Sequence, residues 1–189
     1  AQSALKQAGL KPLVLKEKEG LGLVNGTQIM LSTGCLALRQ AHQLLTFAEK
    51  VTALTYEGME GNPEALNPLI HDLRGQPGQI LSAKAISKEL EGSYLYHKKG
   101  RRKHVQDAYS LRCAPQVHGP IYEILAQASV TLERELNAGT DNPLVFPEEG
   151  LILSGGNFHG EILALTFDYI CIALSVLGNI SDRRLEQLL

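Results

Sequence analysis

The stretch EILALTFDYICIALSVLGNI, residues 161 to 180, decides the fold class of this chain. It is apolar enough to suggest a membrane span, but Glu161 and Asp168 lie within it and its uninterrupted apolar run is short. A helix with such a pattern is typical of the interior of a helical bundle or of a subunit interface. We therefore expect one long helix from about residue 160 to residue 189, and no membrane span.

Two further segments have the same helical period. Between residues 27 and 56 no proline interrupts an apolar pattern made by Cys35, Leu38, Leu45, Ala48 and Val51. Between residues 115 and 137 the apolar positions Val117, Ile121, Ile124, Ala128 and Leu132 are spaced by four, three, four and four residues. With a shorter helix over residues 77 to 90, this predicts an all-α protein, a bundle of long helices.

The exception to helix is the segment NAGTDNPLVFPEEGLILSGGNFHG, residues 137 to 160. Glycines and prolines surround two short β-prone runs, LVF and LIL, which predicts a small hairpin near residues 144 to 153. No internal repeat divides the chain. We expect residues 1–189 to be the central helical part of one larger domain, truncated at both ends.

Composition narrows the class of protein. The 189 residues are 44% hydrophobic and carry a formal net charge of −2, which excludes a disordered chain and gives no overall attraction to nucleic acid or anionic membrane. One local exception, HKKGRRKH at residues 97 to 104, is interpreted as a solvated loop because Gly100 interrupts it and no aromatic residue is interleaved. Nucleic-acid binding through Lys98 to Lys103 remains a weaker alternative.

Cysteine usage points to the cytoplasm. Cys35, Cys113 and Cys171 are far apart and form no CxxC pair, which is typical of reduced thiols rather than of a disulfide framework. No cationic segment followed by an apolar run opens the chain, so no signal peptide is expected. Because no His, Cys and Asp cluster has metal-ligand spacing, we predict no metal site.

Three junctions between loops and helices could carry chemistry. They are GLVNGTQ (residues 22 to 28), QDAYSLRCAPQ (residues 106 to 116) and TDNPLVF…SGGNFHGE (residues 140 to 161). Each alone has an ordinary structural explanation, such as a turn or a helix cap. Together they place amides, a phenol and a guanidinium at helix ends, where a small zwitterion could be held.

These segments closely resemble the motifs of the histidine and phenylalanine ammonia-lyase family. EGLGLVNGTQ, QDAYSLRCAPQVHGP, DNPLVF and SGGNFHGE occur in the family's order, and the resemblance covers nearly the whole chain. It implies a long-helix bundle of the ammonia-lyase/aspartase-like type with a short β-hairpin loop, assembled as a homotetramer. It also implies elimination of ammonia from an aromatic L-amino acid.

The substrate follows less directly from the resemblance. SLRC and RGQPGQ (residues 74 to 79) favour the histidine branch, which converts histidine to urocanate, whereas HGP (residues 118 to 120) departs from the commonest ending of that branch. A phenylalanine or tyrosine ammonia-lyase, or an aminomutase, is the alternative within the family.

The resemblance also implies a cofactor. The family forms methylideneimidazolone (MIO) from an internal Ala-Ser-Gly tripeptide. This group supplies the electrophile that the reaction needs, because the substrate amine is a poor leaving group. The only Ser-Gly dipeptide here, Ser154-Gly155, follows Leu153, so the precursor is absent from this chain. We expect the chain alone to be inactive.

The resemblance assigns six site residues. The catalytic ones are Asn25, which contacts MIO and the substrate amine, Gln106, in the same network, and Tyr109, in proton and ammonia handling. Arg112 binds the substrate carboxylate, Asn142 supports that carboxylate and Phe158 forms an aromatic wall behind the prosthetic group.

Two histidines remain outside these assignments. For His118 and His159 we expect supporting hydrogen bonds rather than catalysis.

A hypothesis of another class is a non-catalytic helical oligomerisation module. The missing Ala-Ser-Gly tripeptide favours it, since a scaffold needs no electrophile.

Overall fold

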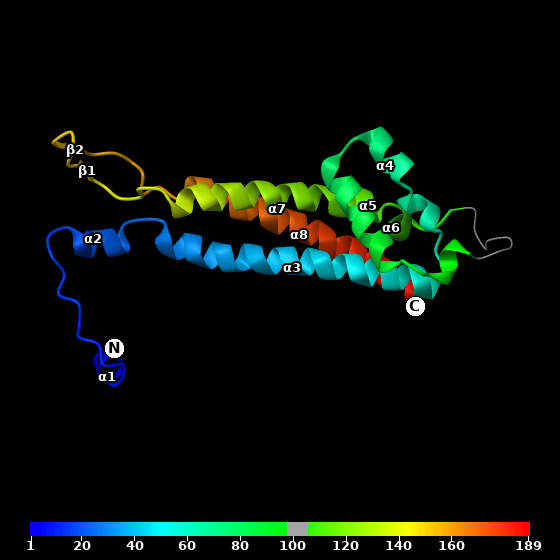
Figure 1. The fold of residues 1–189 in the computed structure, drawn as a ribbon, viewed down its shortest axis with the longest axis horizontal. Coiled ribbons are helices and arrows are strands. Elements are labelled where there is room, and N and C mark those ends of the chain that lie inside the picture. Colours follow the sequence, from blue (N-terminus) through cyan, green and yellow to red (C-terminus); the bar gives the residue numbers. More distant parts are fainter. Residues whose placement is uncertain (98–105) are drawn as a thin grey trace.

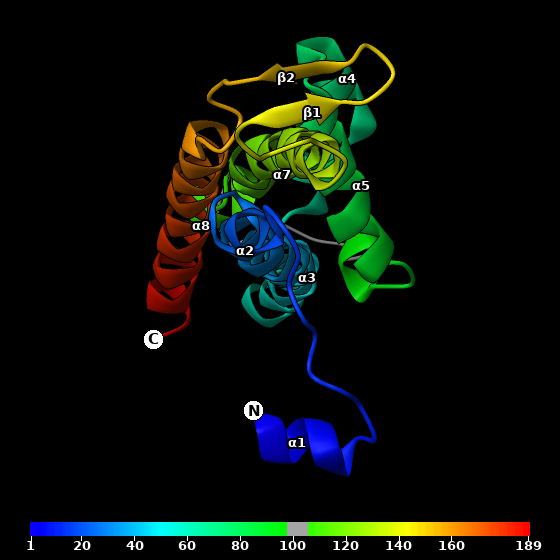
Figure 2. The same cartoon turned by 90° about the vertical axis from the view of Figure 1, so that its left-hand side faces the viewer.

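The computed structural model describes residues 1–97 and 106–189. Most of the basic segment at residues 97 to 104 therefore lies outside the described residues. The prediction of an all-α protein is confirmed, because three long helices dominate the molecule: α3 (Gln28–Met59), α7 (Ala114–Leu136) and α8 (Glu161–Leu188). Figures 1 and 2 show these helices side by side along the long axis.

The apolar stripes predicted from the sequence form the core between these helices. The buried residues of this core are Leu31, Leu38, Ala41, Leu45 and Ala48 from α3, Ile121, Leu125, Ala128 and Leu132 from α7, and Leu163, Ile170, Ala173 and Leu177 from α8. Each set recurs at helical spacing, so one face of each helix is removed from water. The apolar period of each segment therefore determines which face of its helix is buried.

One end of the bundle carries several short elements. The chain passes through the 3-10 turn η1 (Pro63–Leu66), α4 (Pro68–Arg74), α5 (Pro77–Glu89), the 3-10 turn η2 (Tyr94–Tyr96) and the one-turn helix α6 (Tyr109–Arg112). The expected helix over residues 77 to 90 is α5, whereas α4 and α6 were not predicted because they are too short to show a period. A second core cluster around Tyr56 lies at this end.

The opposite end holds the hairpin and the N-terminal helices. Strands β1 (Leu144–Phe146) and β2 (Leu151–Leu153) pair antiparallel, with Leu144 opposite Leu153, where the hairpin was predicted. The short helices α1 (Gln2–Gln7) and α2 (Glu19–Val24) precede the bundle, and α1 lies apart from it (Figures 1 and 2).

Within the described part of the chain, two segments, Glu19–Met59 and Glu161–Leu188, are long and apolar enough to cross a membrane by length and composition. Both pack against α7, and between them they bury the charged side chains of Glu49 and Arg184. Charged groups buried between helices are costly to place among lipid chains, so we read the segments as helices of a bundle.

Candidate functional site

The motif QDAYSLR is centred on the one-turn helix α6. Tyr109 and Arg112 are its first and last residues, and a spacing of three places them on one face. The Arg112 guanidinium carbon lies 4.7 Å from the centre of the Tyr109 ring, which is a cation–π contact. Two of the residues that the family resemblance assigns are therefore in direct contact.

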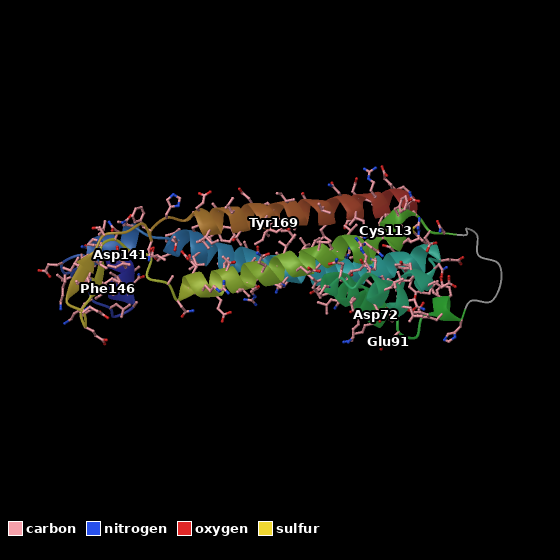
Figure 3. The ribbon with its side chains drawn as sticks, turned by 90° about the horizontal axis from the view of Figure 1, so that it is seen from above. Asp72, Glu91, Cys113, Asp141, Phe146 and Tyr169 are labelled. Atoms are coloured by element: carbon pink, nitrogen blue, oxygen red, sulfur yellow. The ribbon has the colours of Figure 1, made fainter. Side chains whose placement is uncertain are left out.

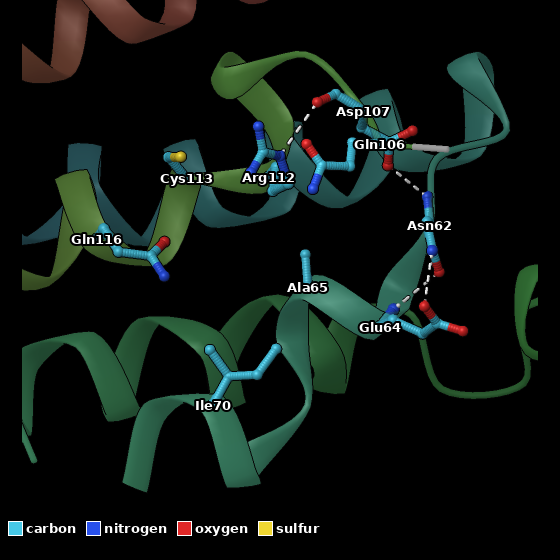
Figure 4. A pocket seen from close by; sticks show the side chains of 9 residues that line it. All are labelled: Asn62, Glu64, Ala65, Ile70, Gln106, Asp107, Arg112, Cys113 and Gln116. Atoms are coloured by element: carbon cyan, nitrogen blue, oxygen red, sulfur yellow. Dashed lines mark hydrogen bonds between the residues drawn. The ribbon is translucent and has the colours of Figure 1, made fainter. Parts of the chain in front are cut away.

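A pocket of about 370 Å³ opens beside α6 (Figure 4). Its lining includes Gln106, Arg112 and Gln116 on one side and residues of η1 on the other. Two hydrogen bonds set its shape: Arg112 Nε donates to the Asp107 carbonyl over 3.3 Å, and the Asn62 N–H donates to the Asp107 carboxylate over 2.5 Å. The two arms of the pocket are thus tied together through Asp107.

Arg112 retains binding capacity in this pocket. Within the part of the chain that the structure describes, no carboxylate forms an ion pair with Arg112, and the Asp107 carboxylate is already bonded to the backbone of Asn62. The terminal nitrogens of a guanidinium can donate two parallel hydrogen bonds to one carboxylate. Arg112 can therefore bind an anionic group that lies in this pocket next to the amide of Gln106.

Tyr109 faces a different surface hollow. The side chain is 73% exposed, and it lines a shallow, mostly apolar hollow of about 510 Å³ together with Val176, Asn179 and Ile180 of α8. The hollow around Tyr109 in one chain does not enclose a substrate. A ligand that contacts this exposed phenol would need to be covered from another side.

Two donors hold α6 from below. The buried Tyr56 hydroxyl donates to the Leu111 carbonyl over 3.1 Å, and Arg184 of α8 reaches the Ser110 carbonyl over 3.4 Å. Burial raises the pKa of Tyr56 above its usual range, with a further contribution from Asp107, so the hydroxyl stays a donor. Burial lowers the pKa of Arg184, partly offset by Glu49 and Tyr56.

The other three assigned residues lie at the opposite end of the bundle. Asn25 follows α2 as its C-cap, and its N–H donates to the Leu21 carbonyl over 2.8 Å. The Asn142 side-chain oxygen accepts from the Gly155 N–H over 2.8 Å and so ties together the two arms of the hairpin loop. Phe158 is 39% exposed in the loop that follows β2.

Two tertiary contacts join the segments around this second group. The Thr27 hydroxyl donates to Glu135 over 2.8 Å, which links the start of α3 to the end of α7. Lys18 pairs with Asp141, and this contact lowers the pKa of Asp141. Asn25, Asn142 and Phe158 therefore belong to one ordered end of the molecule.

The single chain does not bring the six assigned residues together. The 32 residues of α3 separate the two groups, and a helix of that length spans about 48 Å. Figure 3 shows Cys113, next to α6, and Asp141, next to Asn142, at opposite ends of the helices. Gln106, Tyr109 and Arg112 form one group, and Asn25, Asn142 and Phe158 form the other.

The described residues do not supply a methylideneimidazolone group. Leu153 is paired with Leu144 at the edge of the hairpin, and the Gly155 N–H is bound to Asn142. An exposed segment held in this way does not fit the compact turn needed to cyclise a backbone. Among residues 1–97 and 106–189, no group of three or more His, Cys, Asp or Glu side chains could hold a metal ion.

Several residues around α6 were not predicted from the sequence. Asp107 and Asn62 shape the pocket, while Tyr56, Glu49 and Arg184 lie buried beneath it. The sequence does carry one signal, because Glu49 follows Leu45 by four residues on the apolar stripe of α3, where a charge is unexpected.

His118 and His159 have different surroundings. His118 is fully buried on α7 beside Glu49 and Arg184, and the exposed His159 accepts a hydrogen bond from the Glu161 N–H over 3.2 Å. Both make the kind of supporting contact that was expected of them.

The chain is similar to known enzymes over nearly all its length. A sequence profile for aromatic amino acid lyases matches residues 1–189. A histidine ammonia-lyase of Caldanaerobacter subterraneus subsp. tengcongensis is 44% identical over 187 residues, which is 99% of this chain and 37% of that protein. The chain thus spans little more than a third of the length of that curated relative.

Solved structures agree with the sequence comparison. Histidine ammonia-lyase from Trypanosoma cruzi is 40% identical with a TM-score of 0.85, covering 98% of this chain and 34% of that one. Phenylalanine ammonia-lyase from Rhodosporidium toruloides is 37% identical with a TM-score of 0.90, covering 100% of this chain and 28% of that one. The helices and the hairpin are therefore arranged as in these two lyases.

Proposed function

The chain belongs to the aromatic amino acid lyase family, and on that premise we propose that it is the central helical part of a longer ammonia-lyase that converts histidine to urocanate and ammonia. The observation that carries the proposal is α6, which presents an Arg112 without a carboxylate partner among the described residues beside a pocket lined by Gln106. The histidine ammonia-lyase relatives favour histidine as the substrate.

The side chains of α6, together with Gln106 just before it, would divide the work by their chemistry. Arg112 binds the substrate carboxylate, because its fork can donate two parallel hydrogen bonds and stays charged. Gln106 orients the substrate through its amide. Tyr109 takes part in moving the proton and the ammonia, since a phenol both donates and accepts.

The second group would complete the site from another copy of the chain. Asn25 contacts the amine, Asn142 supports the carboxylate and Phe158 forms an apolar wall. Since one chain keeps the two groups at opposite ends of its bundle, a homotetramer whose sites draw on several subunits accounts for both. We place this assembly in the cytoplasm, without a nucleic-acid or membrane partner.

Methylideneimidazolone would supply the electrophile when present. Its Ala-Ser-Gly precursor is absent from the 189 residues, so the residues described here only surround the substrate. What they contribute is binding, orientation and proton handling.

The test is turnover by the complete gene product with histidine, phenylalanine and tyrosine, followed as the absorbance of the unsaturated acid. Histidine should give the highest kcat/KM, and the 189-residue chain alone should give no turnover. A preference for phenylalanine or tyrosine would move the protein to another branch, and a β-amino acid product would identify an aminomutase. Absence of turnover with all three would favour the oligomerisation module instead.

A further inference from the structure

Three titratable side chains meet beneath α6, outside both surface hollows. Glu49 of α3, His118 of α7 and Arg184 of α8 are 2%, 0% and 2% exposed, and we call them the buried triad. Burying two charges is costly unless they are paired and well hydrogen-bonded. An apolar trio would hold three helices together at lower cost, so the triad needs another explanation.

The triad forms a linear chain of contacts from Arg184 through His118 to Glu49. Arg184 Nη1 lies 3.3 Å from His118 Nε2, and His118 Nδ1 lies 3.2 Å from Glu49 Oε2. Because a guanidinium can only donate, His118 Nε2 must accept, which places the imidazole proton on Nδ1, toward Glu49. The imidazole of His118 thus lies between the guanidinium of Arg184 and the carboxylate of Glu49.

Two serines complete the ends of the triad. Ser82 of α5 donates to Glu49 Oε1 over 2.8 Å, and Arg184 Nη2 donates to the Ser181 hydroxyl over 3.0 Å. Four helices, α3, α5, α7 and α8, therefore contribute to one network. Its position is therefore fixed by contacts from several elements outside α6.

The network ends on the backbone of α6. The same Arg184 Nη1 reaches the Ser110 carbonyl over 3.4 Å, and Ser110 lies between Tyr109 and Arg112. A helix of four residues has few internal hydrogen bonds, so donors from outside have a large share in fixing its orientation. Arg184 is the donor that connects α6 to the rest of the bundle through charge.

The network is not optimised for stability alone. Among the described residues, Arg184 Nε, Glu49 Oε2, His118 Nδ1 and the Ser110 hydroxyl are buried without a hydrogen bond of good geometry. Such atoms cost free energy, and a network retained at that cost is better explained by the position it imposes on α6.

We propose that the buried triad is a positioning element that holds α6 in the orientation in which Tyr109 and Arg112 meet the substrate. Glu49 and His118 act through Arg184, and Arg184 acts through the Ser110 carbonyl. The proposal rests on the lyase function proposed above for the meaning of that orientation, but the coupling between the triad and α6 is a property of the fold itself.

The experiment uses the complete gene product and separates positioning from stability. Arg184→Gln removes only the cation from the buried network and can fail to fold, so the decisive variant is the double substitution Glu49→Gln with Arg184→Gln, which removes both charges. Leu45→Ala is the matched control, because it truncates a buried side chain of the same helix α3 in the apolar core.

Two readouts are needed for each variant. Hydrogen exchange of the amides of Arg112 and Cys113, which bond to the Ala108 and Tyr109 carbonyls, reports on α6 without any need for activity. In the double variant we expect exchange there to rise about tenfold. With histidine as substrate, kcat should fall by about 10- to 100-fold with a smaller change in KM.

The outcomes separate this inference from the proposed function. Native exchange rates at α6 in the folded double variant, or equal losses in Leu45→Ala, would overturn the positioning role. Faster exchange with unchanged kcat would also overturn it, since the orientation of α6 would then not matter for turnover. If the unmodified protein has no lyase activity, the proposed function fails, while the exchange rates still decide whether the triad holds α6.

Discussion

At the scale of single residues, Arg112 and Tyr56 show how neighbours decide what a side chain does. Arg112 keeps its guanidinium at the pocket and, among the described residues, donates a hydrogen bond only to the backbone of Asp107, so its charge is available to a ligand. Tyr56 is fully buried, and its hydroxyl donates a hydrogen bond to the carbonyl of Leu111. We propose that the first side chain binds a ligand, whereas the second holds α6 in position.

Arg112→Lys should weaken substrate binding while the fold is kept. A point charge replaces a two-pronged fork, and losing one charge-assisted hydrogen bond costs about 1.5–3 kcal/mol, or about 10- to 150-fold in kcat/KM. Steady-state kinetics on the complete gene product measures this. Arg39→Lys, an exposed arginine of α3, is the control and should leave kcat/KM unchanged. Equal effects of the two substitutions would contradict the role of Arg112.

Tyr56→Phe should lower the free energy of unfolding by about 1–3 kcal/mol, because the buried Leu111 carbonyl loses its donor. Tyr94→Phe is the matched control: that hydroxyl also donates to a backbone carbonyl, at Glu57 over 3.1 Å, but the side chain is 49% exposed and water can replace it. Urea unfolding compares the two. Similar losses in the free energy of unfolding for the two variants would mean that burial does not strengthen the contribution of the Tyr56 hydrogen bond.

At the scale of elements, α5 and α7 cross closely because glycines face each other. A Cβ at Gly78 would lie 2.1 Å from the Gly119 carbonyl oxygen, and a Cβ at Gly119 would lie 2.5 Å from the Gln79 nitrogen. The clashing atoms belong to the backbone, which cannot turn aside as a side chain would. The crossing therefore sets how near α5 comes to the helix that follows α6.

Gly78→Ala should destabilise the fold by about 1–3 kcal/mol, because the helices must separate to admit a methyl group. Gly58→Ala serves as the control, since the nearest atom to an added Cβ there is 3.9 Å away and alanine favours a helix by about 0.5–1 kcal/mol over glycine. Thermal unfolding would show a lower Tm only for the first. A Gly78→Ala protein as stable as the original would mean that the crossing is not tight.

At the scale of the whole molecule, the long helices leave apolar surface uncovered. Leu36, Phe47 and Leu54 of α3 and Leu165 and Ile172 of α8 are each at least 60% exposed. Large apolar side chains exposed along long helices favour association in water. The same helices keep the two groups of assigned residues apart within one chain. Association of chains is therefore the way in which the two groups can form one site.

The complete gene product should sediment as an oligomer at high micromolar concentration, because burying these helix faces removes apolar area from water. Sedimentation equilibrium measures the mass, and the resemblance sets the expectation at four chains. A monodisperse monomer would count against both the association and the homotetramer.

Two inactive variants should restore activity when they are expressed together. Asn25→Ala damages one group and Arg112→Ala the other, so mixed oligomers that share sites between chains contain some sites with neither change. Each variant alone supplies the background rate. Co-expression that stays at this background would mean that the two residues serve the same site from one chain.

The sequence by itself determined the long helices, the hairpin and the content of the core faces of these helices. The apolar period over residues 27 to 56, 115 to 137 and 160 to 189 predicted α3, α7 and α8, and the hairpin followed from LVF and LIL between glycines and prolines. These features are local, because the hydrogen bonds and the amphipathic stripe of a helix depend on residues within a few positions. The motifs also placed the chain in its family.

Only the tertiary structure decided which distant residues meet. It separated the assigned residues into two groups at opposite ends of the bundle, and it brought Glu49, His118 and Arg184 together beneath α6 from three helices. Contacts between residues 66 or more positions apart depend on how the helices are offset and rotated against one another. No local pattern encodes that arrangement, since it is set by packing all the core faces at once.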